Sequence, residues 1–440
     1  MKVVVTGGAG QLGTLVIRRL VLEPTVSEVI SLDIRPPIVA HPKVHTAIGD
    51  VRDPGIGQHF AGADAVIHLA FIVTKVMAKA DFEGINVGGS KNVFETAYQA
   101  GVRRFVYASS VAAYGVIDRT DLVTEDTPRA RDESFAYATC KYDVEAFLDE
   151  WEPTHPGVHV ARLRPSVLVG TRIEHNLGIA LRFRTLPALP QPVPMVWDDD
   201  VAQAFVAALI KDAHGAFNLS CDDPLNGEGL ARAAELRLLP MPERVVRTTL
   251  ALSDFLADHG VGVDPAWVRA TSAQLTPYDT SRAKSLLGWN PMCPNGASVI
   301  RKYVELAPSV LDPRIRLLLG ALPKNSTAPG LEGSTERVHI DLMGPQGGDV
   351  AFLVANGDVE VSYEVPRPPT SVAILKSHHF LDLMAGRTDV KAAEAAGRLK
   401  LEGSPAAALV LTQLAAQLNE QRRHPSTLGE RAMSLFSKLF

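Results

Sequence analysis

The chain contains few cysteines: Cys140, Cys221 and Cys293 are the only three in 440 residues. They lie far apart, so they form no cluster with the spacing of metal ligands. An odd number also does not fit a framework of paired disulfides, whereas it fits a reducing compartment. We therefore expect a cytoplasmic protein without a metal site.

Long apolar runs and excess basic charge are also lacking. No stretch reaches the ~18 apolar residues of a membrane-spanning helix. The apolar run within Met1–Thr6 meets glycines at once and is too short for the core of a signal peptide. A net charge of -5 indicates no face for nucleic acid. With 46% hydrophobic and 21% charged residues, the chain has the composition of a globular protein.

The first half alternates strand and helix patterns. Stretches with helical apolar spacing, such as Thr14–Leu22 and Asn86–Ala100, separate short β-rich runs. These runs are Val3–Val5, Val29–Leu32, Ala65–Leu69, Phe105–Ala108 and Val158–Leu163. Strands that alternate with helices predict βαβ units and a parallel sheet. The expected fold is α/β, a Rossmann-type doubly wound sheet with a small substrate subdomain.

The pattern changes along the second half. It loosens after Glu174, prolines interrupt residues 182–196, and a helix is predicted at Asp199–Ile210. The segment 322–333 is rich in Pro, Gly, Ser and Thr, which is typical of a linker.

Beyond this linker the pattern predicts a second, α+β domain. Alternating strands are predicted at Val338–Leu342, Asp349–Val354 and Val359–Val365, and helices at Ser377–Ala385 and Ala406–Arg422. Asn356-Gly357 between two of the strands is a strong hairpin dipeptide. We expect helices on one face of an antiparallel sheet.

Glycines follow the first predicted strand in VVVTGGAGQLG (3–13). Gly8, Gly10 and Gly13 match G-x-G-x-x-G between a strand and a helix, and Asp33 ends the second strand. Glycines let the backbone approach a pyrophosphate, and the helix N-terminus offers it N–H groups and positive charge. A carboxylate at Asp33 can accept hydrogen bonds from an adenine ribose and would repel a 2′-phosphate. This favours NAD, and Arg35 keeps NADP open as the alternative.

A second motif carries chemistry. Tyr137 and Lys141 form Y-x-x-x-K, and residues four apart share one face of a helix. A nearby ammonium stabilises a phenolate, so we expect Lys141 to lower the pKa of Tyr137 and to enable proton exchange with a carbinol or carbonyl oxygen. Ser110, after the strand Phe105–Ala108, can donate a hydrogen bond to the same oxygen.

Residues 1 to about 305 resemble the extended short-chain dehydrogenase/reductase family, which includes nucleotide-sugar epimerases and dehydratases and 3β-hydroxysteroid dehydrogenases. The resemblance rests on segments that follow one another in order. They are TGGAGQLG (6–13), LDIR (32–35), GDVRD (49–53), VIHLA (66–70), INVGGSKNV (85–93), VYASSVAAYG (106–115), YATCK (137–141), RLRPSVLVG (162–170), DDDVAQAF (198–205) and DTSRAKSLLGW (279–289).

The resemblance implies roles for individual residues. It implies that Ser110, Tyr137 and Lys141 are catalytic. It implies that Asp33 holds the ribose, that Asp50 and Val51 hold the adenine, and that Lys141 grips the nicotinamide ribose. The cofactor-binding residues it implies are Gly7, Gly10, Gln11, Leu12, Gly13, Asp33, Ile34, Arg35, Asp50, Val51, Leu69, Ala70, Phe71, Tyr137, Lys141, Pro165 and Val167. For Asn86, a place near the site and a structural role are equally open.

The substrate side departs from the nucleotide-sugar members. Those members carry an arginine in a Gly-x-Gly-x-x-x-Arg-Asp-Phe stretch, where this chain reads PALPQPVPMVWDDD. Val111 and Ala112 also replace the acidic or basic pair of the dehydratases after Ser110. An apolar substrate is therefore expected over LRFRTLPALPQPVPMVW, with a loop that merely covers the core as the alternative.

The C-terminal part resembles a sterol carrier protein type 2 domain, over residues 339–414. That family folds a twisted sheet under helices around an apolar tunnel for lipids. The tail places Leu428, Leu435, Phe436, Leu439 and Phe440 on one helical face. This face could lie on a membrane, cap a tunnel or pack on its own domain.

The leading hypothesis is an NAD(P)-dependent oxidoreductase that interconverts a hydroxyl and a ketone on an apolar, lipid- or steroid-like molecule. A nucleotide-sugar epimerase/dehydratase and a lipid carrier with a cofactor-sensing first domain are the alternatives. The expected partners are this substrate, a lipid ligand and at most a peripheral membrane contact, with a homodimer left open. The expected domains are 1–170, a dinucleotide-binding core; 171–321, a substrate-side subdomain; 322–333, a linker; 334–425, a sterol-carrier-like domain; and 426–440, an amphipathic tail.

Overall fold

A computed structural model describes most of the chain. The described residues are 1–73, 79–115, 122–171, 185–187, 192–239, 277–306, 311–320, 322, 326–344, 347–365 and 367–423. They form two compact units, one of residues 1–37 and 43–303 and the other of residues 38–42 and 304–440. The tail residues 426–440 and much of the proline-rich stretch 182–196 lie outside the described residues.

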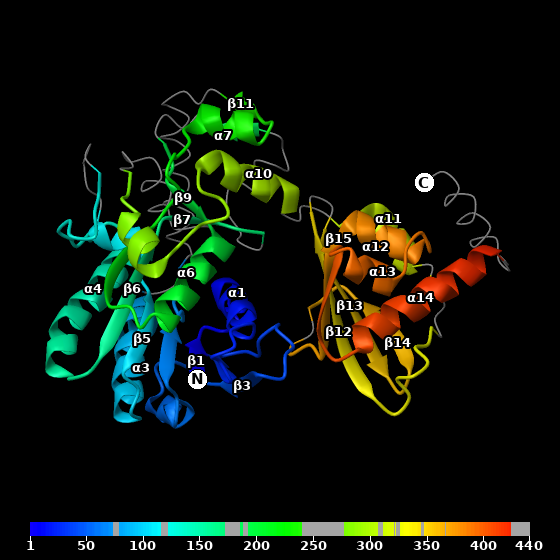
Figure 1. Cartoon of the computed structure of the whole chain (residues 1–440), viewed down its shortest axis with the longest axis horizontal. Coiled ribbons are helices and arrows are strands. Elements are labelled where there is room, and N and C mark those ends of the chain that lie inside the picture. The colour runs from blue at the N-terminus through cyan, green and yellow to red at the C-terminus, as the bar shows by residue number, and fades with distance from the viewer. Residues whose placement is uncertain are drawn as a thin grey trace. The chain divides into compact units, whose positions relative to one another are not determined.

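A seven-stranded sheet is the centre of the first unit (Figure 1). The strand order is β10-β6-β5-β4-β1-β2-β3, and each neighbouring pair is parallel. The strands are β1 (Lys2–Thr6), β2 (Glu28–Asp33), β3 (Val44–Ile48), β4 (Ala65–His68), β5 (Arg104–Ala108), β6 (His159–Pro165) and β10 (Gly215–Leu219). Because all strands are parallel, their carboxyl ends share one edge, and the loops that leave this edge can build a common site.

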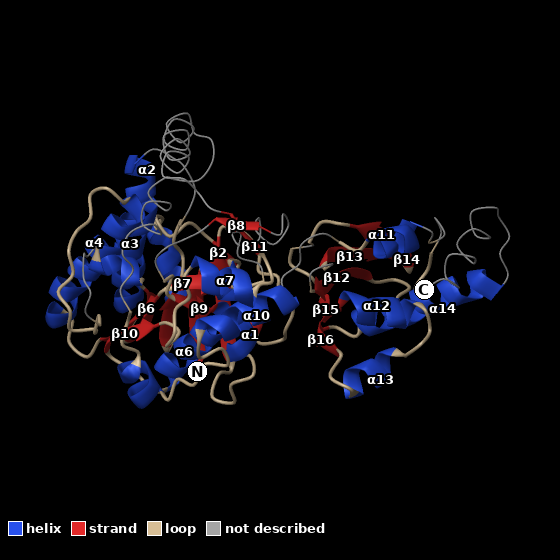
Figure 2. Ribbon diagram, turned by 90° about the horizontal axis from the view of Figure 1, so that it is seen from above, coloured by secondary structure: helices blue, strands red, loops and turns tan. Residues whose placement is uncertain are grey.

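Helices cover this sheet on both sides, as Figure 2 shows. Helices α1 (Gln11–Leu20) and α6 (Asp198–Ile210) pack on each other, as do α3 (Gly89–Gln99) and α4 (Ala136–Trp151). Shorter helical segments are α2 (Lys79–Glu83), the π-helical turns Gly84–Gly88 and Ala283–Leu287, and the 3-10 turns Pro54–Phe60, Val111–Tyr114 and Glu152–Thr154. The expected doubly wound α/β fold is confirmed.

Smaller elements complete this part of the chain. The strands β7 (Val167–Val169) and β9 (Met195–Trp197) form one parallel pair, and β8 (Thr185–Pro187) and β11 (Arg237–Leu239) form another. The helices are α7 (Gly227–Ala233) and α10 (Gly296–Leu306).

The second unit contains a five-stranded sheet with the order β14-β13-β12-β15-β16. Its elements are α11 (Pro313–Gly320), β12 (Thr335–Met343), β13 (Gly348–Ala355), β14 (Asp358–Ser362), β15 (Ser371–Lys376), α12 (Ser377–Met384), α13 (Val390–Ala395), β16 (Leu399–Gly403) and α14 (Ala406–Arg423). Alternate residues of β12, among them Val338, Ile340 and Leu342, join the apolar core, and α12 and α14 pack on β12 and β15. The predicted hairpin turn is present, because Asn356 and Gly357 both have positive φ, at 52° and 88°.

One expectation for this unit needs correction. The sheet is mixed and not antiparallel, because β12 pairs in parallel with β15. The compact unit that contains this sheet includes residues 38–42 and the chain from Val304 onward, and α11 contributes Ile315 and Leu318 to its core.

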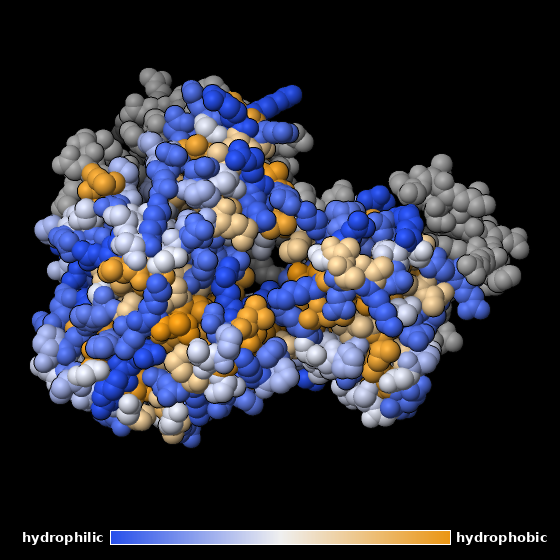
Figure 3. Space-filling model, viewed as in Figure 1, coloured by the Kyte–Doolittle hydropathy of each residue, from blue (hydrophilic) through white to orange (hydrophobic). Residues whose placement is uncertain are grey.

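The visible surface mixes charged and apolar side chains in Figure 3. Large exposed apolar residues such as Leu22, Ile48, Leu286 and Leu317 are far apart in the sequence. Among the described helices, none combines the length and the apolar character needed to cross a membrane.

Candidate active site

The glycine loop after β1 is held tightly against the loop after β4. Gly7 has a φ of 70° and donates its N–H to the Leu32 carbonyl at 2.9 Å. A Cβ on Gly7 would lie 2.7 Å from the backbone nitrogen of Ala70, and a Cβ on Gly13 would lie 2.3 Å from the Gly7 oxygen. Glycine is therefore required at both positions for the loop to close on itself.

The start of α1 is open to an anion. The backbone N–H of Thr14 donates to the Gly10 carbonyl at 2.9 Å, and helix geometry leaves the N–H groups before it without intrahelical partners. The first turn carries no acidic side chain. A Cβ on Gly10 would meet only the Gly7 oxygen, at 3.1 Å. These features fit a bound pyrophosphate.

Asp33 lies at the end of β2, beside this loop. Its Oδ2 accepts the Ala9 N–H at 3.1 Å, and its Oδ1 accepts the Arg35 N–H at 3.3 Å. These contacts fix a negative charge close to the glycine loop, where an adenine ribose would lie. Ile34 next to it is 71% exposed.

Asp50 has a strong partner of its own. The Arg52 guanidinium donates from Nε at 3.0 Å and from Nη2 at 2.6 Å, and this pairing lowers the pKa of Asp50. Val51 is buried, and its carbonyl accepts from Asn92 Nδ2 at 2.8 Å. Any contact of Asp50 with an adenine must therefore share the carboxylate with Arg52.

The segment after β4 lies between the glycine loop and α4. The Leu69 N–H donates to the Thr6 carbonyl at 3.1 Å. The Asn86 side chain accepts from the Ile72 N–H at 2.8 Å and donates to the Ile72 carbonyl at 3.0 Å. Asn86 is fully buried, so its structural role in closing this loop is evident from the geometry.

Lys141 lies at the centre of the site. Its Nζ donates to the Ala108 carbonyl at 2.5 Å and stands 3.4 Å from the centroid of the Phe71 ring. The Tyr137 ring meets Phe71 edge-on, with centroids 5.7 Å apart. Burial lowers the pKa of Lys141 well below its usual value.

Ser110 and Tyr137 form a hydrogen bond across the end of β5. Our expectation for the tyrosine's pKa is wrong for this structure. Burial raises the pKa of Tyr137 to about 12, and the Ser110 hydrogen bond only partly opposes this. The Lys141 Nζ, 5.6 Å from the centroid of the Tyr137 ring, is turned to the Ala108 carbonyl and the Phe71 ring.

Two parts of the chain are similar to known protein families. Residues 3–220 match the model of the NAD dependent epimerase/dehydratase family, and residues 316–416 match the SCP-2 sterol transfer family. These two segments of the chain belong to those families. The expected enzyme class, an NAD(P)-dependent oxidoreductase of the extended short-chain dehydrogenase/reductase type, is confirmed.

Individual relatives are similar to parts of the chain. A 3-beta-hydroxysteroid dehydrogenase of Mycolicibacterium neoaurum is 33% identical over 184 residues, which is 38% of this chain and 48% of that protein. An N-acetyl-alpha-D-glucosaminyl-diphospho-ditrans,octacis-undecaprenol 4-epimerase of Escherichia coli O157:H7 is 31% identical over 137 residues, 30% of this chain and 40% of that protein.

Among solved structures, the UDP-glucose 4-epimerase from Bifidobacterium longum in complex with NAD+ and UDP has a similar fold. Its TM-score is 0.52 at 19% identity, and the match covers 69% of this chain and 98% of that one.

In this epimerase/dehydratase-family unit, Pro165 and Val167 complete the edge. Pro165 ends β6, and Val167 is 36% exposed and donates its N–H to the Pro194 carbonyl at 3.3 Å. Ser166 between them is buried, and its Oγ has no partner within the described part of the chain. The predicted residues thus follow β1, β2, β3, β4, β5 and β6 at one edge of the sheet.

One group at this edge escaped the sequence interpretation. The Ser109 hydroxyl donates to Glu145, which is two helical turns beyond Tyr137. The spacing of Tyr137, Lys141 and Glu145 places all three on one face of α4 and is visible in the sequence. The residues at the end of β5 and on β6 that pair with these side chains cannot be identified from the sequence.

Proposed function

We propose that this protein is an NAD-dependent oxidoreductase that interconverts a hydroxyl and a ketone on an apolar, steroid- or lipid-like substrate, with the second unit as the lipid-binding part. The observation that carries the proposal is the presence of a sterol transfer family segment in the same chain as a Ser110–Tyr137–Lys141 arrangement.

The geometry of the first unit supports the following chemical roles. The Tyr137 hydroxyl exchanges a proton with the substrate oxygen, and Ser110 holds that oxygen and the tyrosine together. Lys141 is held by the Ala108 carbonyl and the Phe71 ring, and its ammonium would hold a ribose hydroxyl of the bound dinucleotide. The bound dinucleotide would accept or donate the hydride.

Cofactor choice rests on Asp33. The carboxylate accepts the Ala9 and Arg35 N–H groups beside the glycine loop, which supports a role in holding the ribose. A 2′-phosphate there would bring two negative charges together, which disfavours NADP. We therefore propose NAD as the preferred cofactor.

The lipid-like substrate class rests on two further points. The core of the second unit is rich in aliphatic side chains, and Phe352, Phe380 and Met384 are fully buried in it. The relative named as a 3-beta-hydroxysteroid dehydrogenase matches part of the first unit. An apolar ligand that buries about 300 Å² would gain about 7 kcal/mol before association costs, so micromolar binding is expected.

The test uses the full-length protein. Co-purifying small molecules are extracted and identified by mass spectrometry, and 3β-hydroxysteroids or long-chain alcohols are then supplied with NAD while NADH is followed. Turnover of an apolar alcohol supports the proposal. Turnover of a UDP-sugar, with none of any apolar alcohol, would establish the epimerase alternative instead.

Lipid binding is measured separately by titration of a fluorescent sterol or fatty acid. Binding of a sterol or fatty acid without any redox turnover would support the alternative, a lipid carrier with a cofactor-sensing first domain. No binding below about 100 micromolar would remove the lipid role of the second unit.

A further inference from the structure

A buried carboxylate lies directly behind the catalytic edge. Glu145 is fully buried on α4. Its Oε1 accepts from Arg164 Nε at 2.9 Å and from the Ser109 hydroxyl. Its Oε2 accepts from Arg164 Nη2 at 2.5 Å and from Arg129 Nη1 at 3.0 Å. Each of the two carboxylate oxygens thus accepts two hydrogen bonds from protein groups.

The position of Glu145 relates it to the reacting groups. Tyr137, Lys141 and Glu145 follow one another at four-residue spacing, so they face the end of β5 on successive turns of one helix. Three consecutive residues at the end of β5 pair with these three side chains. Ser110 bonds Tyr137, the Ala108 carbonyl accepts from Lys141, and Ser109 donates to Glu145. We call this set of three pairs the α4–β5 ladder.

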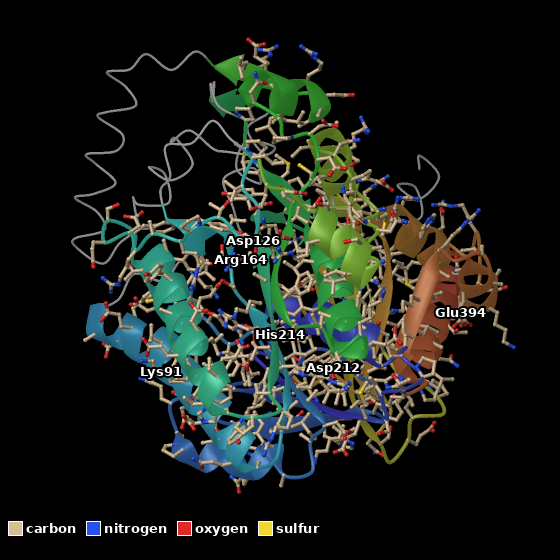
Figure 4. The ribbon with its side chains drawn as sticks, turned by 60° about the vertical axis from the view of Figure 1, so that its left-hand side comes forward. Lys91, Asp126, Arg164, Asp212, His214 and Glu394 are labelled. Carbon is tan, nitrogen blue, oxygen red and sulfur yellow. The ribbon has the colours of Figure 1, made fainter. Side chains whose placement is uncertain are left out.

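Arg164 ties the ladder to the next strand. This β6 residue is 4% exposed, and its Nη1 donates to the Tyr114 hydroxyl at 2.8 Å. That hydroxyl in turn donates to Asn218 Oδ1 of β10 at 2.8 Å. Figure 4 labels Arg164 in the interior of the first unit. Glu145 is therefore the point where α4, β5 and β6 are joined.

Charge gives Glu145 a second effect. Burial lowers the pKa of Lys141, and the Glu145 carboxylate opposes that lowering. Burial alone would raise the pKa of Glu145, but its hydrogen bonds with Arg164 and the arginine's charge keep it below its ordinary value. Glu145 thus stays ionised and favours the ammonium form of Lys141. The titratable groups around Lys141 are His68 on β4, Tyr107 on β5, and Tyr137, Cys140 and Glu145 on α4.

We propose that Glu145 is a positioning residue for catalysis, which fixes the end of β5 against the Tyr137/Lys141 face of α4 and supplies the negative charge nearest to the lysine on that face. The inference rests on the proposed redox function of this site. It assigns Glu145 no contact with substrate or cofactor.

The test compares Glu145→Gln with the wild type in two measurements. The first is NADH affinity as a function of pH, which needs no substrate. Affinity that depends on the Lys141 ammonium is lost as pH rises through the lysine's pKa. Without the Glu145 charge this loss should occur about 1 pH unit lower. The second is kcat on an apolar alcohol that the wild type oxidises, which should fall between about tenfold and about 100-fold with KM nearly unchanged.

Two variants serve as controls. Asp143→Asn makes the same chemical change on the same helix, where Asp143 accepts two hydrogen bonds from Arg131 at 2.7 and 3.0 Å on the surface. It should leave both measurements as in the wild type. Glu145→Asp retains the negative charge. It should show the wild-type pH profile of NADH affinity and a kcat between those of Glu145→Gln and the wild type.

Glu145→Gln leaves Arg164 without its buried partner, so it could fail to fold. Glu145→Gln with Arg164→Met then replaces it, because removing both members of a buried pair is often tolerated. The proposal is overturned if the folded variant has the pH profile and kcat of the wild type. If the wild type turns over no alcohol, the proposed function fails, while the NADH profile still decides the role of Glu145.

Discussion

The two units differ in the amount of charge that they bury. In the first, the charged residues Lys141, Glu145 and Arg164 are almost completely buried beside the catalytic edge. In the second, the side chains buried between helices and sheet are mostly apolar, and the buried polar ones include His339, which pairs with Asp349 at 2.8 Å. Buried ions require exact partners, and breaking such a pair is costly, whereas an apolar core tolerates change as long as its volume is kept. The difference teaches that the first unit depends on exact pairing of buried ions beside its site, and the second mainly on apolar packing.

Removing a large apolar side chain from the second unit should have the largest effect, because it should lower the stability of that unit and leave NADH binding by the first unit unchanged. Phe352→Ala in β13 deletes a fully buried ring and should destabilise the second unit by about 3–5 kcal/mol. Calorimetry of the full chain should show this unit's transition at lower temperature, with NADH binding retained. Tyr363→Ala is the matched control, because Tyr363 is 45% exposed. Simultaneous loss of NADH binding would show that the two units are not independent.

Tyr137→Phe should affect chemistry and leave stability alone. The change removes the proton-exchanging hydroxyl and should lower turnover by at least about 100-fold, while the NAD affinity and both melting transitions stay nearly unchanged. Turnover at the wild-type rate would take Tyr137 out of the mechanism.

A pH effect should be confined to the first unit. Asp198 is 5% exposed, and burial, with the nearby Asp199, raises its pKa to about 7. Its folded-state pKa is above the unfolded value, so the stability it contributes is present in acid and is lost as pH rises toward 7. Asp198→Asn should therefore stabilise the first unit at pH 8 relative to pH 5 by up to about 2–3 kcal/mol. An equal gain at both pH values would contradict this.

The smallest expected effect concerns cofactor choice. Asp33→Asn keeps the shape of the side chain but removes the charge that disfavours a 2′-phosphate, and should reduce the NAD-to-NADP affinity ratio by about tenfold. Titration of both cofactors measures it. If the wild type already binds NADP more tightly than NAD, Arg35 sets the choice.

Much of the first unit can be predicted from its sequence, because strands buried on both faces form short apolar runs and chemical motifs sit at fixed spacings. The glycine loop, Asp33 and the Tyr137/Lys141 pair are of this kind. The raised pKa of Tyr137 could not be predicted, because desolvation depends on what packs around the ring. Arg164 could not be assigned to Glu145 either, since their pairing depends on how β6 lies against α4.

The second unit was harder to predict in detail. Its three-strand meander and both long helices agree with the alternation in the sequence, and the structure adds β15 and β16. The run Ser371–Lys376 is short and apolar, and such a run does not reveal its pairing partner. Its parallel alignment with β12 comes from tertiary packing, because a parallel neighbour must arrive by a long connection.

The α4–β5 ladder has a consequence for how this enzyme can change over generations. Its three rungs use the main-chain carbonyl of residue 108 and the side chains of residues 109 and 110, so a point substitution at residue 109 or 110 alters one rung at a time. An insertion or deletion of a single residue within β5 would move both serines out of register with Tyr137 and Glu145. Lineages of this protein should therefore accumulate length changes in the surface loops and keep the length of β5 constant.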